Sequence, residues 1–302
     1  MEFGKVAKEE LEFIDFTLPP DHALTKKVLA EAPKKEKLAV YVGCAKWGRK
    51  EWVGNLYPKG TKDSDFLKNY VKHFNSIELN GTFYQNHPAE RVKSWYETAP
   101  EGFTFSPKFP QSISHYSRLK NADKATDEFF VNISELKEKL GHLLLQLPDN
   151  FAPKSQPELL AYLKSVHRTF PVAVELRNTN WFNDDELSRE TFAAMHDMGV
   201  SSVITDAAGR RDCLHQVLPT PVAFIRFVAN DMHPTDYLRM DLWIERIADW
   251  IDQGLKRVYF YVHNQNELYS PKLCEYFITE LNSRCKLDLT LPFEKPVQGE
   301  LF

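Results

Sequence analysis

Long apolar runs and paired cysteines are both missing from this sequence of 302 residues. No stretch approaches the roughly 18 consecutive apolar residues that a membrane span requires, and the opening MEFGKVAKEELEF lacks the apolar centre of a secretory signal. The four cysteines contain no CxxC pair and are too few for a disulfide framework at this length. We therefore expect a cytoplasmic protein with reduced thiols.

Motifs for common cofactors are missing too. Glycine is scarce, at 12 residues, and the sequence contains no GxGxxG, GxxxxGK[ST], GxSxG or HExxH pattern, so we expect no nucleotide cofactor. The ten histidines are scattered without ligand spacing, which argues against a zinc site, while a divalent metal held by carboxylates stays open. The net charge of -4 excludes the overall positive field of a nonspecific nucleic-acid binder.

Short apolar runs alternate with longer segments of helical period, which is typical of a parallel sheet with crossover helices. Eight such units predict a (β/α)8 TIM-type barrel, with a doubly wound open sheet as the alternative. The sixth unit is weak, because residues 210–217 offer at most one or two helical turns. The predicted strands are 39–45, 76–80, 103–109, 142–147, 172–177, 201–206, 222–227 and 258–264.

Segments of different composition flank the predicted barrel, which we place at residues 38–285. Residues 1–37 are rich in Lys and Glu and predict an extension with one short helix, capped by Asp21 and running over Ala23 to Leu29. Residues 286–302 carry two prolines and no amphipathic period, and predict an extended tail.

Polar side chains stand at the carboxyl end of nearly every predicted strand, where the active face of such a barrel lies. Burying one unpaired charge costs several kcal/mol or shifts its pKa, so this many ionisable groups should pair with one another or with a ligand. The set is Lys46, Glu78, Asn80, Lys108, Gln146, Glu175, Arg177, Asp206, Arg226 and Asn264.

Distinct roles follow from the chemistry of these side chains. Lys108, Arg177 and Arg226 would clamp an anion such as phosphate, with Glu78 or Glu175 as general base, giving Glu78, Glu175 and Lys108 as candidate catalytic residues. A hard divalent metal could be held by Glu78, Glu175 and Asp206. The alternative is structural: the same charges could neutralise one another in the barrel.

Aromatic residues follow several of the same strands. Trp47, Tyr84 and Trp181 come directly after strands one, two and five and could form the wall of a pocket for a planar or sugar-like ligand. The alternative is packing between loops and helices.

The chain resembles the YecE-like family, known as domain of unknown function 72, over roughly residues 39 to 280. The resemblance is carried by VGCAKWGRKEWVGNLYP, IELNGTFYQNHP, FTFSPKFPQSISH, LGHLLLQLPDNF and VELRNTNW, in this order. The resemblance implies a TIM-type barrel fold. It implies no particular activity, because none is settled for the family. The family's recurrent polar positions map onto Glu78, Asn80, Tyr84, Lys108, His115, Gln146, Glu175, Arg177, Trp181, Arg226 and Asn264.

Two departures from the family pattern affect the expected site. The usual Arg-x-His-Gly of strand seven is replaced by Arg226, Phe227, Val228 and Ala229, so a mechanism that needs that histidine is in doubt here. The usual Ser-Gly before the tryptophan of strand one is replaced by Ala45 and Lys46, which adds positive charge and favours a more anionic ligand.

These observations favour an enzyme acting on an anionic, phosphate-bearing substrate, with phosphoester hydrolysis as the most concrete form. One alternative is a non-catalytic module that binds an anionic small molecule or nucleic-acid fragment. It would be recruited to DNA-associated partners through the terminal QGELF, which resembles the Q-x-x-L-F peptide that bacterial replication proteins insert into the sliding clamp, with Gln298, Leu301 and Phe302 as anchors. A second alternative is isomerase or glycosidase-like chemistry with paired carboxylates.

Overall fold

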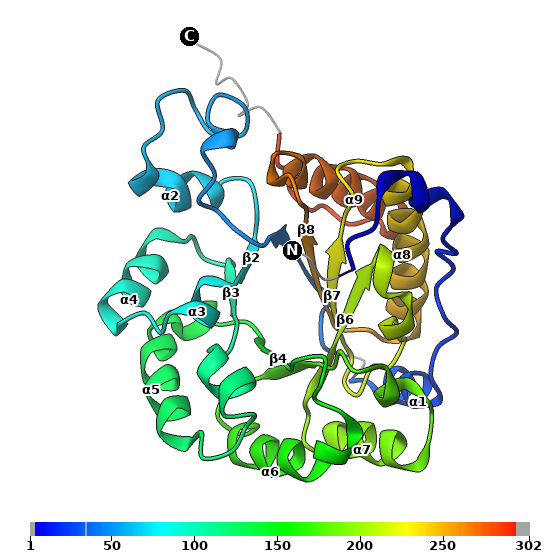
Figure 1. The fold of residues 1–302 in the computed structure, drawn as a ribbon. Helices are drawn as coiled ribbons and strands as arrows, with labels where there is room; N and C mark the ends of the chain where they lie inside the picture. The colour runs from blue at the N-terminus through cyan, green and yellow to red at the C-terminus, as the bar shows by residue number, and fades with distance from the viewer. Residues whose placement is uncertain (1–3, 34, 294–302) are drawn as a thin grey trace.

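The computed structural model describes residues 4–33 and 35–293, and over these residues the chain forms eight strands that alternate with helices (Figure 1). Every predicted strand is present, with ends that differ from the prediction by at most two residues. The strands are β1 (Ala39–Cys44), β2 (Ser76–Leu79), β3 (Thr104–Pro107), β4 (Leu143–Gln146), β5 (Val172–Glu175), β6 (Ser201–Ala207), β7 (Val222–Val228) and β8 (Arg257–His263).

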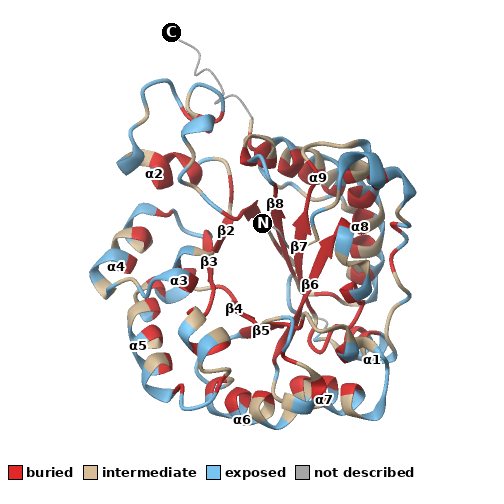
Figure 2. Cartoon of the chain, in the orientation of Figure 1, coloured by how far each residue is buried: buried red, intermediate tan, exposed pale blue. Residues whose placement is uncertain are grey.

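All paired strands are parallel. Six of them form one curled sheet in the order β1-β8-β7-β6-β5-β4, and β2 pairs with β3 in a separate two-stranded sheet. The order falls steadily from β8 to β4, with no reversal of the kind that a doubly wound sheet has at its switch point, so that alternative is wrong. Almost every strand residue is buried, because helices cover the outer face and opposing strands cover the inner one (Figure 2).

Helices lie around the strands on the outside (Figure 1). After β6 the chain forms only the short 3-10 helix η8 (Ala208–Cys213), as the weak pattern of the sixth unit predicted. None of the described helices is long and apolar enough to cross a bilayer. The α-helices after β1 are α2 (Phe66–Tyr70), α3 (Gly81–Tyr84), α4 (Ala89–Thr98), α5 (Asp123–Ile133), α6 (Gln156–Val166), α7 (Glu186–Asp197), α8 (Pro234–Gln253) and α9 (Ser270–Cys285).

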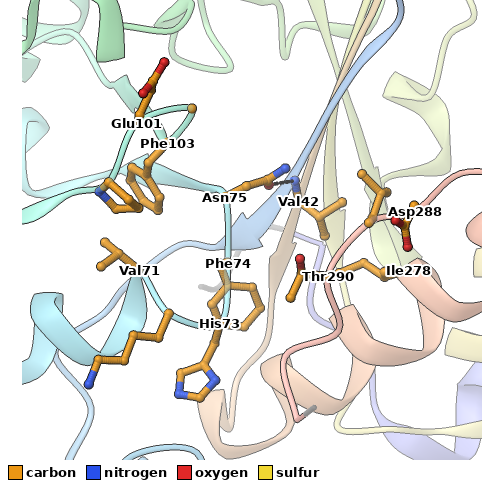
Figure 3. Close-up of a pocket in the computed structure, with 14 residues that line it drawn as sticks. Val42, Val71, His73, Phe74, Asn75, Glu101, Phe103, Ile278, Asp288 and Thr290 are labelled. Carbon is orange, nitrogen blue, oxygen red and sulfur yellow. Dashed lines mark hydrogen bonds between the residues drawn. The ribbon is translucent and has the colours of Figure 1, made fainter. Parts of the chain in front are cut away.

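The strand ladder is interrupted at two seams. Between β3 and β4 only isolated bridges occur, such as Phe105 with Leu140. Between β1 and β2 side chains replace the ladder: Asn75 Oδ1 accepts from the backbone N of Val42 at 2.9 Å, and its Nδ2 donates to the backbone O of Val40 at 2.8 Å (Figure 3). The prediction of eight parallel strands is confirmed, but the described ladder does not run unbroken around a closed barrel.

A glycine permits the close approach of β1 to β2. A Cβ on Gly43 would lie 2.0 Å from the backbone O of Ser76 and 2.8 Å from the hydroxyl of Tyr70. That hydroxyl spans the same seam, because it donates to the Ser76 carbonyl and accepts from the backbone N of Cys44, both at 2.8 Å. Any larger residue at position 43 would push the two strands apart.

The extension and the tail both pack against the strand-helix core. Helix α1 (Ala23–Glu31) confirms the predicted helix, but its cap is His22, whose ring accepts from the backbone N of Leu24; the predicted cap Asp21 bonds Arg246 instead. In the described part of the tail, Leu289 is held by the Asn282 side chain through both its N and O.

Candidate functional site

Three charged residues predicted at strand ends meet inside the strands as one ion cluster, formed by Glu78, Glu175 and Arg226. Arg226 donates from Nε and Nη2 to the two carboxylate oxygens of Glu78, each at 2.9 Å. Its Nη1 donates to both oxygens of Glu175, at 3.1 and 2.9 Å. All three residues are fully buried, so the cluster is closed to solvent. These distant residues do converge, but on one another in a closed cluster rather than on a solvent-reachable hollow, which is the structural alternative that the sequence left open.

Further partners complete the cluster. His263 Nε2 lies 3.0 Å from Glu78 Oε2, while Glu175 Oε1 accepts from Arg177 Nε at 2.7 Å and from Thr205 Oγ1 at 2.8 Å. Burial opposes ionisation of Glu175, but the charges of Arg177 and Arg226 outweigh it and lower its pKa to about 2. The pKa of Glu78 falls well below its usual range in the same way, because Arg226 and His263 outweigh burial.

This geometry changes the roles that the sequence predicted for the two glutamates and for Arg226. A general base must contact its substrate and hold a pKa near the working pH. Glu78 and Glu175 are inaccessible, ionised and bonded to Arg226, so they anchor the guanidinium instead. Arg226, predicted to bind substrate, is likewise occupied by the protein itself. The paired-carboxylate route to glycosidase or isomerase chemistry loses its basis with them.

A cavity of about 510 Å³ lies next to this cluster, at the carboxyl ends of β2, β3, β4 and β8. We call it the strand-end pocket. Its volume falls in the range of small-molecule sites. It gathers most of the predicted polar residues, and it is lined by Ala45, Lys46, Arg49, Asn80, Phe83, Tyr84, Lys108, Gln111, His115, Gln146, Arg177, Val228, His263, Asn264, Gln265 and Glu267.

Lys108 is the central titratable group of the strand-end pocket. Its Nζ donates to Gln146 Oε1 at 2.7 Å and lies 4.1 Å from the centre of the Phe83 ring. Only 7% of the residue is exposed. Burial and the charge of Arg226 lower its pKa to about 7, against the opposing effect of the two glutamates. Its amine therefore exchanges a proton near neutral pH, which an ordinary lysine does not.

Two other nitrogen-bearing side chains border Lys108. His115 Nδ1 lies 2.9 Å from Ser114 Oγ, and burial together with the charges of Lys108 and Arg177 lowers its pKa to about 4. Its ring is therefore neutral at neutral pH. Arg177 reaches the pocket from the end of β5 while its Nε holds Glu175.

Asn264 contributes a donor without a partner. Its Oδ1 accepts from the backbone N of Asp231 and of Gln265, at 3.0 and 2.9 Å, which fixes the orientation of the amide. Among the described residues its buried Nδ2 has no hydrogen-bond partner, although Asn264 is only 6% exposed. Buried donors are seldom left unpaired, so this nitrogen suits an acceptor on a ligand in the pocket.

Trp47 and Trp181 do not line the strand-end pocket. Trp47 packs edge-on against Trp95 and Phe105, with ring centres 5.5 and 6.5 Å apart. Trp181 is fully buried, its Nε1 donates to the backbone O of Phe151, and it borders a different cavity, described below. Of the three aromatic candidates, only Tyr84 lines the strand-end pocket, where it is 75% exposed.

Asp206 points away from the ion cluster. Residues alternate between the two faces of a strand, and its neighbour Thr205 takes the inner face. Asp206 instead accepts from Arg239 and from Trp243 Nε1 on helix α8, and from Arg211. The proposed metal ligands Glu78, Glu175 and Asp206 therefore do not converge, and the described residues contain no cluster of three or more His, Cys, Asp or Glu suited to a metal.

Sequence reasoning missed Arg49, Gln111 and Glu267 as lining residues. Arg49 stands inside the first stretch that carries the family resemblance, which was the available signal. Glu267 lies in the loop after β8 and bonds Ser270 Oγ at 2.7 Å, with Arg49 at 3.9 Å. The sequence around Glu267 gives no sign that it lies near Arg49, which is more than 200 residues earlier.

Comparison with known proteins identifies the family. The model of the family described as "Protein of unknown function DUF72" matches residues 41–296. The chain belongs to this family. Among DUF72 relatives, the UPF0759 protein YecE of Escherichia coli (strain K12) is 29% identical over 252 residues, covering 78% of this chain and 89% of the relative. The resemblance found in the sequence is thereby confirmed.

Two further DUF72 comparisons agree. The UPF0759 protein YunF of Bacillus subtilis (strain 168) is 29% identical over 151 residues, which cover 48% of this chain and 52% of YunF. A crystal structure of a DUF72 family protein (EF0366) from Enterococcus faecalis V583 superposes with a TM-score of 0.64 at 19% identity, covering 84% of this chain and all of that chain. This structural likeness shows a shared fold. The tail residues Gln298, Leu301 and Phe302 lie outside the described residues.

Proposed function

We propose that the chain is a TIM-type barrel enzyme whose strand-end pocket binds an anionic small molecule, with Lys108 as the acid-base group. The observation that carries the proposal is the state of Lys108: a buried amine, held by Gln146 at 2.7 Å, with a pKa of about 7, on the wall of a 510 Å³ pocket. Acid-base catalysis is most efficient when the pKa of the group lies near the working pH.

The charges around the pocket support an anionic ligand. Lys46, Arg49, Lys108 and Arg177 line it against a single carboxylate, Glu267. That carboxylate is engaged by Ser270 and Arg49. Charge-assisted bonds to phosphate or carboxylate oxygens are about twice as strong as neutral ones, and arginine suits them best.

Phosphoester hydrolysis is the most concrete reaction for this set of residues. Water would add to phosphorus as the P–O bond to the leaving group breaks, and protonated Lys108 could give its proton to the leaving oxygen while the neighbouring cations hold the non-bridging oxygens. The proton that the water loses would pass to solvent, from which Lys108 is protonated again. Arg226, Glu78 and Glu175 would act indirectly: Glu175 is held by Arg226 and in turn holds the Nε of Arg177, which positions that guanidinium at the pocket.

The test is turnover of a panel of phosphomonoesters and phosphodiesters, with and without Mg²⁺ or Mn²⁺, by the purified protein and by Lys108→Met. We expect the variant to lose about 10² to 10⁴ in rate, the range for removal of an acid-base group. The matched control is Lys139→Met, because Lys139 is also buried but donates to the backbone O of Tyr96 and Ala99. Equal turnover by Lys108→Met and the parent protein would refute the role of Lys108.

A further inference from the structure

A second cavity, of about 480 Å³, lies on the outside of the strands between the extension and helix α7. Residues 19–23 cover one side of it, and residues 214–217, which lead into β7, form another. It shares no lining residue with the strand-end pocket. We call it the outer pocket. What it binds does not depend on the function proposed for the strand-end pocket.

Gln216 places a buried amide in the outer pocket. Gln216 is 2% exposed, and among the residues that the structure describes neither its Nε2 nor its Oε1 has a hydrogen-bond partner. Ser188, also 2% exposed, lines the same pocket, and its hydroxyl interacts with the Asp185 carboxylate. Most buried side-chain polar atoms are paired, so an amide with both ends unpaired indicates a missing partner.

Gln216 is held firmly by its backbone. Its carbonyl O accepts from the backbone N of His22 at 3.2 Å and from Thr25 Oγ1 at 2.7 Å. The same Thr25 hydroxyl accepts from the backbone N of Leu218 at 2.8 Å. The start of helix α1 therefore pins the backbone of the segment that carries Gln216.

Flat rings form one wall of the outer pocket. Phe182 and His215 stack with ring centres 4.7 Å apart and planes 15° apart, and Phe192 lies 6.2 Å from the His215 ring. Burial lowers the pKa of His215 to about 4, so this ring is uncharged at neutral pH. Stacked neutral rings offer a surface that suits another planar ring.

The acidic side chains at the outer pocket have partners, one of them outside the pocket. Asp184 lies 3.6 Å from His22 Nε2 and 3.4 Å from Arg189 Nη1. Asp21 accepts from Arg246 at 2.8 Å. The pocket therefore offers an uncharged ligand a planar wall and a neutral amide.

We propose that the outer pocket binds a neutral planar heteroaromatic ring of the nucleobase class, read on one edge by the Gln216 amide. An amide presents a donor beside an acceptor, which matches an edge that carries an acceptor beside a donor, as the N6 and N7 edge of adenine does. Ser188 supplies one further hydroxyl, and the stacked rings supply the apolar wall.

The experiment is calorimetric titration of the full chain with adenine, hypoxanthine, uracil and cytosine, and with adenosine to separate a free base from a base that carries a sugar. We expect saturable binding of at least one base. Gln216→Leu should weaken it at least tenfold. The same variant should raise the melting temperature of the unliganded protein, because leucine removes two unpartnered buried polar atoms.

The matched control is Gln156→Leu on helix α6. Gln156 Nε2 is already bonded, to Thr191 Oγ1 at 2.9 Å and to the backbone O of Leu187 at 3.2 Å, so its loss should lower the melting temperature and leave base affinity unchanged. Ser188→Ala is a second variant, expected to weaken binding without unfolding the chain. Absence of saturable binding by every base and by adenosine, or equal affinity in Gln216→Leu, would overturn the proposal. Lys108→Met should bind bases normally, which separates this site from the proposed enzyme activity.

Discussion

Replacing Arg226 with methionine tests the ion cluster most directly. Arg226→Met keeps an unbranched side chain but removes the cation that holds four hydrogen bonds to Glu78 and Glu175. Removing one partner of a buried ion pair costs about 3–5 kcal/mol, because the other charge stays buried. Glu78 keeps His263, and Glu175 keeps Arg177, so we expect the loss of unfolding free energy to stay within that range.

The pH dependence gives this prediction a second signature. In the parent protein the pKa of Glu175 is about 2, below its unfolded value of 4.5, so its stabilising contribution is present above about pH 4.5 and is lost as the pH falls toward 2. In Arg226→Met the carboxylates stay buried without the guanidinium, so their pKa values rise. Protonation of these carboxylates then removes the unpaired buried charge, so the loss of unfolding free energy relative to the parent protein should shrink between pH 7 and pH 5.

The assay is urea unfolding of both proteins at pH 7, 6 and 5. Adding Glu78→Gln and Glu175→Gln to Arg226→Met should recover part of the lost free energy, since the two buried carboxylate charges are removed together with the guanidinium, although Arg177 then loses its bond to Glu175. The control is Arg284→Met, which removes an exposed pair with Glu245 and should be indistinguishable from the parent. A deficit below about 1 kcal/mol, or one that is constant from pH 7 to pH 5, would refute the electrostatic account.

Three other outcomes are expected. Sulfate binding to the strand-end pocket should weaken as the pH rises through about 7, where Lys108 loses its proton. The variant Lys108→Arg should bind sulfate equally from pH 6 to 8. If calorimetry finds the same pH dependence for both proteins, the lowered pKa of Lys108 is contradicted. Gly43→Ala should lower the free energy of unfolding by about 1–3 kcal/mol in urea, through the clash with Ser76, whereas Gly48→Ala, whose Cβ would meet only Phe66 at 4.0 Å, should not; equal stabilities would count against the seam. If the chain is instead the module recruited through its terminal peptide, deleting residues 298–302 should abolish retention by an immobilised sliding clamp with an unchanged circular dichroism spectrum, and full retention would exclude that peptide as the anchor.

Strand positions could be predicted because each short apolar run is buried on both faces. The weakness of the sixth unit was also visible, since residues 210–217 lack a helical period and form only η8 before the chain turns into β7. The cap of helix α1 was missed for a physical reason: Asp21 and His22 both suit the position, and only the tertiary bond from Arg246 to Asp21 decides between them.

The candidate site was predicted in part. Their positions at the ends of parallel strands predicted that Glu78, Glu175 and Arg226 lie together, and mutual neutralisation was one of two interpretations, but the sequence could not decide between it and pairing with a ligand. Asp206 shows that a polar residue at the end of a strand need not face the candidate site. Its orientation follows from Thr205, which pairs in register with Arg226, and register between strands depends on long-range packing that one sequence does not reveal.

The seam between β1 and β2 differs from the strand contacts that are joined by a backbone ladder. In a ladder the hydrogen bonds come from the backbone and survive a change of side chain. Here they come from the amide of Asn75 and the phenol of Tyr70, with Gly43 opposite. A single substitution at one of these positions can therefore loosen the attachment of β1 to β2, which makes this edge of the strand assembly unusually sensitive to point mutation.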